Sequence, residues 1–173
     1  PYFYEEDNWV DDMELGAALL HQLTGEARYL DAAMAYARRE PVTPWMGADT
    51  ASHYQWYPFW NAGHYEAWTR SAAAQRAELA QFYRDGLERV VARANNGFLI
   101  GVPFIWCSND LVVSFATQAT LYRRMTGDRR FEEYELAALD WLFGANPWGT
   151  SMVIGVPREG VWPRDPHTEL PPS

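Results

Sequence analysis

The sequence predicts an all-α fold in which αα-hairpins form part of a toroid. Apolar residues recur every three to four positions along much of the chain, which is typical of helices that bury one face. A Thr-Gly turn between two helical patterns occurs at Thr24 and again at Thr126. These repeats lie roughly 100 residues apart, whereas short solenoid units recur about every 34 to 47 residues. We therefore expect a closed toroid of hairpins and not a solenoid.

The first hairpin is predicted from two helical patterns on either side of Gly25. Residues 10–23 carry an apolar stripe with a spacing near 3.6 residues, and Asn8 is a suitable cap for this helix. Glycine ends helices well, so we expect the helix to end at Gly25. Residues 29–37 carry the stripe of a returning helix, which completes an αα-hairpin.

Residues 41–60 interrupt the helical pattern. They include three prolines, three tryptophans, Gly47 and His53, so we expect a loop without regular secondary structure that lines a cleft. Asn61 is suited to cap the next helix, and residues 61–94 are expected to form one or two helices. Near its start, His64 is open to two interpretations, a structural histidine or a ligand-binding one.

The last hairpin is predicted over residues 111–125 and the helical pattern that runs into Gly144. Ser108, Asn109 and Asp110 precede it and are all good helix caps. After Gly144, the pair Asn146-Pro147 and then Gly149 predict a turn and a rigid, aromatic-lined loop. His167 follows Pro166, and from the residues alone it is also explained as a surface histidine that bonds to its own turn.

Composition excludes several classes of function. The 173 residues amount to one domain, and their net charge of −9 with scattered basic residues argues against nucleic acid and polyanionic partners, but not against a neutral ligand. No apolar run approaches the roughly 20 residues needed to cross a bilayer, so no membrane partner is expected. A single cysteine, Cys107, forms neither an internal disulfide nor a cysteine-based zinc site, and the four histidines lack metal-ligand spacing.

Aromatic residues make up 16% of the chain and include nine tryptophans. A buried indole N–H needs a partner, so a chain with this many tryptophans is expected to use some of them outside the core. Flat sugar rings pack on aromatic faces, which makes a saccharide site one use for them. Core packing is the competing explanation for each tryptophan taken singly.

Three segments resemble glycoside hydrolase family 9, whose members are mostly cellulases and related β-glucanases. The pattern Leu142-x-Gly144-x-Asn146-Pro147-x-x-x-Ser151-x-Val153-x-Gly155, followed by Pro166-His167, resembles the histidine signature of that family. The segment from Trp106 to Asn109 is similar to the family's Trp-Gly-Ser-Asn, with Cys107 in place of glycine. The segment from Trp9 to Ala17 is similar to its Trp-Asp-Asp-x-x-x-Gly-Ala.

The resemblance implies an (α/α)6 barrel of six inner and six outer helices. Residues 1–173 would be a partial catalytic domain, truncated at both ends and drawn from its C-terminal half. The expected activity is inverting hydrolysis of β-glucan, a cellulose-like substrate. The catalytic base and acid of the family lie in motifs outside this chain, so the isolated fragment is expected to be inactive. A secreted or extracytoplasmic location is also implied.

The resemblance assigns a substrate-binding role to most of the candidate site residues. His167 is the catalytic candidate, bonding to the sugar next to the scissile bond, while Trp106, Ser108, Asn109 and Trp9 are expected to contact substrate. No cofactor is expected, although calcium is conceivable in the full-length protein. For Asp11 and Asp12, helix capping is the simpler explanation. Thr168 and Glu169 stand where the family has His-Arg, and Asp110 and Leu111 stand where some members have Arg and Tyr, so substrate preference stays open.

Two alternatives come from other classes. An α/α-toroid epimerase acting on sugars would need two histidines facing each other as acid and base, for which His53 or His64 with His167 are the candidates. A non-catalytic helical carbohydrate-binding protein would instead have a complete core within these 173 residues, whereas part of a barrel would leave an apolar face open.

Overall fold

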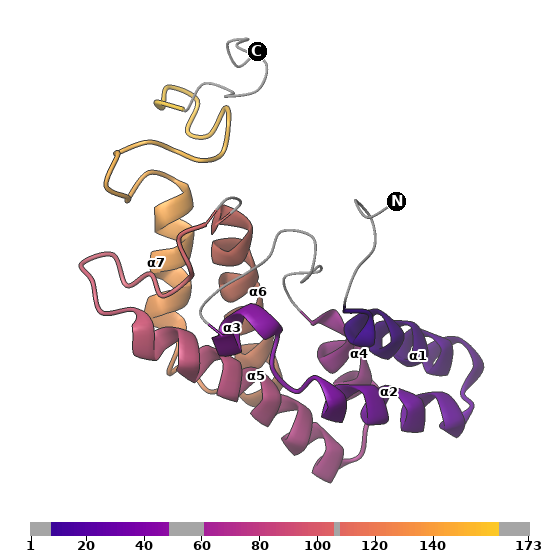
Figure 1. The fold of residues 1–173 in the computed structure, drawn as a ribbon. Coiled ribbons are helices and arrows are strands. Elements are labelled where there is room, and N and C mark those ends of the chain that lie inside the picture. Colours follow the sequence, from indigo (N-terminus) through magenta and orange to yellow (C-terminus); the bar gives the residue numbers. More distant parts are fainter. Residues whose placement is uncertain (1–7, 49–60, 106–107, 163–173) are drawn as a thin grey trace.

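The computed structural model describes residues 8–48, 61–105 and 108–162. These residues form seven α-helices and no strand, which confirms the predicted all-α class (Figure 1). None of the helices in these ranges is long and apolar enough to span a membrane.

Six of the helices pair as three αα-hairpins in chain order. Helices α1 (Val10–Thr24) and α2 (Ala27–Arg39) form the first, α4 (Ala62–Arg70) and α5 (Ala73–Arg93) the second, and α6 (Ser108–Thr126) and α7 (Glu132–Leu142) the third. Helix α4 packs against α1 and α5 packs against α6, so the hairpins follow one another from right to left in Figure 1. This succession of hairpins is the predicted arc of an α/α toroid.

The turns of the first and third hairpins have the same geometry. In each, a threonine hydroxyl donates to the carbonyl four residues earlier at 2.8 Å, Thr24 to Leu20 and Thr126 to Tyr122. The glycine that follows adopts a positive φ, 71° at Gly25 and 75° at Gly127. The sequence repeat is therefore a repeat of turn structure, and the left-handed glycine is what ends each first helix.

Replacing Gly127 by alanine is expected to lower the free energy of unfolding by about 1 kcal/mol, because a Cβ is disfavoured at this positive φ. Gly16 is a matched control, since it lies inside α1 and an added Cβ meets no atom within 4 Å there, as at Gly127. Alanine at position 16 is expected to stabilise the protein by about 0.5–1 kcal/mol. Urea unfolding of both variants measures the two effects, and the same sign for both would contradict this account.

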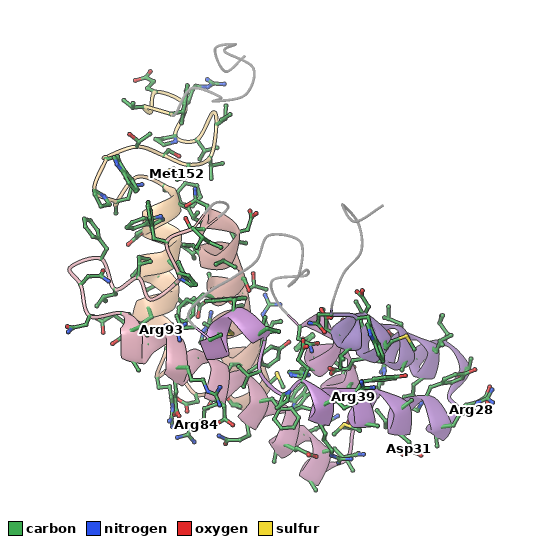
Figure 2. The ribbon with its side chains drawn as sticks, viewed as in Figure 1. Arg28, Asp31, Arg39, Arg84, Arg93 and Met152 are labelled. Carbon is green, nitrogen blue, oxygen red and sulfur yellow. The ribbon has the colours of Figure 1, made fainter. Side chains whose placement is uncertain are left out.

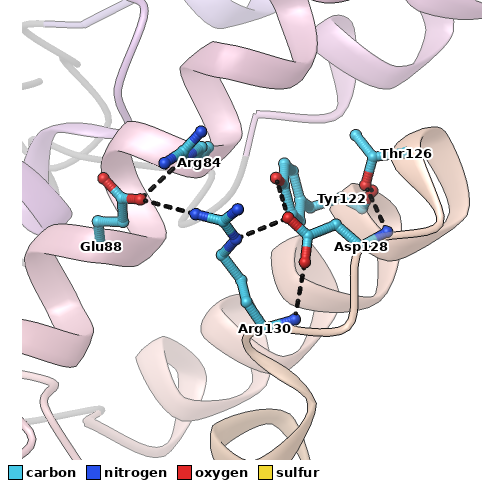
Figure 3. Close-up of polar contacts among 6 residues, drawn as sticks. All are labelled: Arg84, Glu88, Tyr122, Thr126, Asp128 and Arg130. Carbon is cyan, nitrogen blue, oxygen red and sulfur yellow. Dashed lines mark hydrogen bonds and ion pairs between the residues drawn. The ribbon is translucent and has the colours of Figure 1, made fainter.

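A polar network fixes the third hairpin's turn against α5 (Figure 3). The Asp128 carboxylate accepts from the Tyr122 hydroxyl at 3.0 Å and from the Arg130 guanidinium at 2.6 Å. Arg130 also reaches Glu88 of α5 at 3.4 Å, and Glu88 accepts from Arg84 at 2.7 Å. The network therefore joins two hairpins through exposed charges, each of which contributes little to stability alone.

The prediction that residues 41–60 lack regular structure is wrong for their first part. Residues Pro44–Ala48 form a short helix, α3, whose Trp45 and Met46 side chains are fully buried. Proline is favoured in the first turn of a helix, and burial of the two large side chains holds the turn in place. Arg93, at the end of α5 in Figure 2, donates to the Met46 carbonyl at 2.8 Å. Residues 49–60, with His53, lie outside the described residues.

The main core lies between α3, α5, α6 and α7, and a smaller core joins α1, α2, α4 and α5. The two outermost hairpins also expose large apolar side chains. These are Met13, Leu20 and Leu23 on α1, and Val113, Leu136 and Leu139 on α6 and α7. Leu23 is 82% exposed. The first and third hairpins, which are the terminal hairpins of the arc, thus expose apolar side chains in addition to those buried in the two cores.

Candidate functional site: an aromatic pocket beside the start of α6

Three of the five predicted site residues lie in the described part of the chain. Ser108 and Asn109 form the first turn of α6, and Trp9 immediately precedes α1. The other two, Trp106 and His167, lie outside the described residues, so their predicted roles stay predictions. The helix begins at Ser108, so Ser108, Asn109 and Asp110 are its first residues and not caps that precede it.

Trp9 is half-exposed and is held against α2. The Arg39 guanidinium lies 4.8 Å from the centre of the Trp9 ring, and Tyr36 makes an edge contact with the same ring at 6.2 Å. Arg39 is labelled in Figure 2 on α2, the helix that pairs with α1. A cation over an aromatic face contributes about 0.5–1 kcal/mol at an exposed site. Trp9 therefore ties the start of α1 to α2, and it does not line the pocket described next.

Ser108 lines a pocket of about 260 Å³ between α6, α7 and the loop that precedes α6. Among the described residues, no charged side chain lines it; its walls are Asn96, Phe98, Ile100, Val102, Phe104, Ser108, Val112, Trp141 and Pro147. Asn109 supports one wall, because its side-chain oxygen accepts from the Trp141 indole N–H at 3.4 Å. The structure thus places Ser108 in the wall of this mostly apolar pocket and Asn109 beside it, against Trp141.

Four aromatic rings at this pocket form a contiguous group, the aromatic cluster, which consists of Phe98, Phe104, Trp141 and Trp148. Phe104 stacks on Trp148 with ring centres 6.2 Å apart and an angle of 24°. Trp141 makes edge contacts with both Phe98 and Trp148. Phe104 is 79% exposed and Trp148 is 54% exposed, so the stacked pair presents aromatic surface to solvent.

The loop that carries Trp148 is held by two buried polar side chains. The Asn146 amide donates to the carbonyls of Trp141 and Thr150, and its oxygen accepts from the Trp148 and Thr150 N–H groups. Ser151 donates to the carbonyl of Val156 and accepts from the Val153 N–H. The predicted rigid, aromatic-lined loop after the last helix is therefore present.

A second hollow extends the aromatic surface toward the C-terminal end of the described chain. Trp148, Thr150, Met152 and Trp162 line a space of about 330 Å³. Met152 is labelled in Figure 2 in the loop that follows α7. Trp148 lines this second hollow and contacts Phe104 and Trp141 of the first, so an aromatic surface continues from the pocket beside Ser108 to Trp162.

A separate group of acidic residues lies where α1 begins. Asp11 is buried, with 4% of its surface exposed, and Oδ1 has no hydrogen-bond partner among the described residues. Burial, with the nearby charges of Glu40 and Asp12, raises the pKa of Asp11 to about 7. Burial likewise raises the pKa of Glu40. The raised pKa of Asp11 therefore follows from its packing beside other acidic groups.

The free energy of unfolding is expected to fall by about 2 kcal/mol as the pH rises from 4 to 7, because the folded state keeps the Asp11 proton that the unfolded state loses. The stability that the Asp11 proton contributes is fully present below pH 3.8, the pKa of Asp11 in the unfolded chain. It is lost as the pH rises through about 7, the pKa of Asp11 in the folded protein. Asp11→Asn is expected to flatten this dependence and to stabilise the protein at pH 8. Urea unfolding at each pH tests it, with Asp12→Asn as the exposed control; an unchanged slope in Asp11→Asn would refute it.

His64 is a structural histidine, one of the two interpretations left open by the sequence. It is buried, its Nδ1 lies 2.7 Å from Oε1 of Glu14, and its Nε2 lies 3.2 Å from the Pro41 carbonyl. Both ring nitrogens are therefore engaged within the fold. Within residues 8–48, 61–105 and 108–162, no group of three or more His, Cys, Asp or Glu side chains is arranged to hold a metal ion.

The sequence did not point individually to Phe98, Phe104, Trp141, Trp148 or Trp162 as site residues. The signals for the tryptophans were their excess in the composition and the predicted aromatic-lined loop after Gly144, which contains Trp148 and Trp162, and neither signal assigned a role to a single ring. Their grouping depends on the packing of α7 against α6, which brings residues about 40 positions apart into contact. Glu14 was missed for a similar reason, since nothing local marks it as the partner of His64.

A family model described as glycosyl hydrolase family 9 matches residues 1–170. Comparison with curated proteins and comparison with solved structures found no match.

Proposed function

Because the chain belongs to glycosyl hydrolase family 9, a family of glycoside hydrolases, we propose that it forms part of an enzyme that hydrolyses β-glucan with inversion at the anomeric carbon. The match covers nearly the whole chain, as the three resembling segments implied. A carbohydrate substrate follows from the family. The choice of a cellulose-like β-glucan and of inversion goes beyond the family match and is our proposal.

The aromatic cluster is the observation that carries the substrate proposal. Its exposed rings suit the apolar faces of β-linked glucose units, while the uncharged pocket wall suits a neutral ligand. Ser108 and Asn96 add polar groups at the same pocket. We therefore place one or more glucose units against Phe104 and Trp148, with Trp106 and His167 expected to contact the same chain of sugars.

The chemistry needs two carboxyl groups on opposite sides of the scissile bond. In inversion, one donates a proton to the leaving oxygen and the other activates a water, at a separation of about 6.5–9.5 Å. Neither the family's base motif nor its acid motif has a match in this chain, so both groups are proposed to lie in other parts of the enzyme. His167 would hold the sugar beside the scissile bond. No organic cofactor is required, and a role for calcium in the full-length protein stays a proposal.

The apolar surface on the terminal hairpins supports the proposal that the domain is larger than these residues. Met13, Leu20 and Leu23 are exposed on α1, and Leu136 and Leu139 on α7. In a closed toroid, further hairpins would cover both groups. Residues 1–173 are therefore proposed to be part of one catalytic domain. Because an insoluble polymer has to be met outside the cell, we also propose a secreted or extracytoplasmic location.

The alternatives are less well supported. An epimerase needs histidines free to exchange protons with the sugar, and both ring nitrogens of His64 are engaged by Glu14 and Pro41. A non-catalytic protein with a complete core would not be expected to expose large side chains on both terminal hairpins.

The proposal is tested on the full open reading frame by measuring the reducing sugar released from β-1,4-glucan, mixed-linkage β-glucan, xylan and chitin. Release from the β-glucans supports it. Sugar epimerisation, or binding to glucan without release, would overturn the hydrolase proposal.

Trp148→Ala in the same protein is expected to raise KM for soluble β-glucan about 10-fold with little change in kcat, because the ring binds sugar without reacting. Phe143→Ala is the matched control, since Phe143 is similarly exposed but is not part of the aromatic cluster. Its KM is expected to stay within twofold of the parent value. An equal effect of the two substitutions would contradict the assigned role of Trp148.

A further inference from the structure

We propose that Glu14 and His64 are positioning residues, whose buried contact fixes the connection between α2 and α4 and, through it, one wall of the aromatic pocket. The inference rests on the proposed function for its kinetic consequence. The structural part of the inference is that this pair sets the position of residues 41–48. It is supported by contacts within the fold.

The pair belongs to a network in which each named polar group has a partner. Glu14 is 0% exposed; one of its oxygens meets His64 Nδ1 at 2.7 Å and the other accepts from the Asn61 amide at 3.0 Å. The Tyr83 hydroxyl donates to the Asn61 carbonyl. The Pro41 carbonyl only accepts, so His64 Nε2 carries a proton, and a further proton lies between Nδ1 and Glu14.

The network joins the two ends of one connection to α1. Pro41 follows the end of α2, and Asn61 caps the start of α4. His64 holds Pro41 while Glu14 holds both His64 and Asn61, so one carboxylate on α1 sets both ends. The approach is close enough that a Cβ at Gly63 would lie 2.7 Å from Glu14 Cγ, which requires glycine there.

Stability alone does not account for this arrangement. A buried charge pair often stabilises no more than apolar side chains of the same volume, because both groups lose their hydration. What directional bonds add is a defined geometry, since each bond fixes a distance and an angle that apolar packing leaves adjustable. The network therefore specifies position more than it adds stability.

The fixed connection reaches the pocket through Arg93. Its guanidinium donates to the Met46 carbonyl in the connection at 2.8 Å and to the Gly101 carbonyl at 3.3 Å. Gly101 lies in the loop that supplies Phe98, Ile100, Val102 and Phe104 to the pocket. Trp45 also packs in the same core as Leu111 and Val112, and Val112 lines the pocket. A displaced connection would thus displace a wall of the proposed sugar site.

The test uses Glu14→Met in the full-length protein, labelled with 5-fluorotryptophan, beside Glu135→Met. Methionine has a similar volume but bonds to neither His64 nor Asn61, whereas glutamine could keep both contacts. Glu135 is a matched control because its buried carboxylate also pairs with a basic side chain, Arg123 at 2.8 Å, and with the Thr120 hydroxyl, but away from the connection. We expect Glu14→Met to shift the ¹⁹F signal of Trp45 and to raise KM for soluble β-glucan at least 10-fold, with kcat within about twofold. Glu135→Met is expected to do neither.

Arg93→Lys is the second variant, in case Glu14→Met folds poorly. A lysine reaches only one of the two carbonyls, so a similar rise in KM is expected with the Glu14–His64 pair intact. A Trp45 signal that does not move in Glu14→Met, or an equal rise in KM in Glu14→Met and Glu135→Met, would overturn the inference. A shifted Trp45 signal in a protein that releases no sugar from glucan would support the positioning role and overturn the proposed function instead.

Discussion

Glu14→Ala is expected to lower the free energy of unfolding by about 3–5 kcal/mol, which is the largest stability effect that we predict for this chain. The substitution leaves the His64 ring and the Asn61 amide buried without their acceptor. Such groups lose their hydration without regaining a hydrogen bond. His64→Ala is expected to have a loss of similar size, because it leaves the Glu14 carboxylate buried without its main partner. Urea unfolding at pH 7 measures both.

A double-mutant cycle separates the pair from the volume lost at each site. The double variant is expected to lose at least about 2 kcal/mol less than the two single losses added together, because the second substitution removes a group that the first left unpaired. The control cycle uses Arg38 and Glu78, which bond at 2.8 and 2.9 Å but on the surface. Its coupling is expected to stay below about 1 kcal/mol. Equal coupling in the two cycles would contradict the description of the buried network.

His167→Ala in the full-length enzyme is expected to lower kcat/KM for β-glucan at least 100-fold, or about 2.7 kcal/mol of transition-state stabilisation. The reason is its proposed position beside the scissile bond, where a hydrogen bond to the sugar strengthens as the ring distorts. Hydrolysis of a soluble β-glucan measures the effect, and the temperature of unfolding is expected to change little.

His21→Ala is the control for that experiment. His21 is half-buried in the last turn of α1, where its Nδ1 meets the Glu26 carbonyl at 2.9 Å. Activity within twofold of the parent is expected for this variant. If both histidine variants keep full activity, His167 is not a substrate-binding residue, and the family signature has been assigned a wrong role in this chain.

The helices were predictable because their signals are local. Gly25 and Gly127 adopt the left-handed conformation that ends a helix, which glycine favours. The turn repeat was therefore visible in the sequence, and the structure confirms it. Asn61 was likewise identified as a cap, and it accepts from the His64 N–H. Helix α3 was missed because its stability comes from burial of Trp45 and Met46 in a core that a local pattern does not reveal.

The site was only partly predictable, since it depends on contacts between distant segments. Ser108 and Asn109 were found through a motif, and the structure places Ser108 at the pocket wall and Asn109 against Trp141. The stacking of Phe104 on Trp148 depends on how α7 packs on α6, which sequence spacing does not specify. The same holds for Glu14 and His64, which lie on different hairpins and meet through the packing of α1 on α4.

The most direct test of the proposed function is the configuration of the first product released from a β-1,4-linked oligosaccharide by the full-length protein, followed by ¹H NMR. Inverting hydrolysis predicts that the α-anomer appears first and that the β-anomer forms only by later mutarotation. Initial release of the β-anomer, or no release of sugar at all, would contradict the proposal.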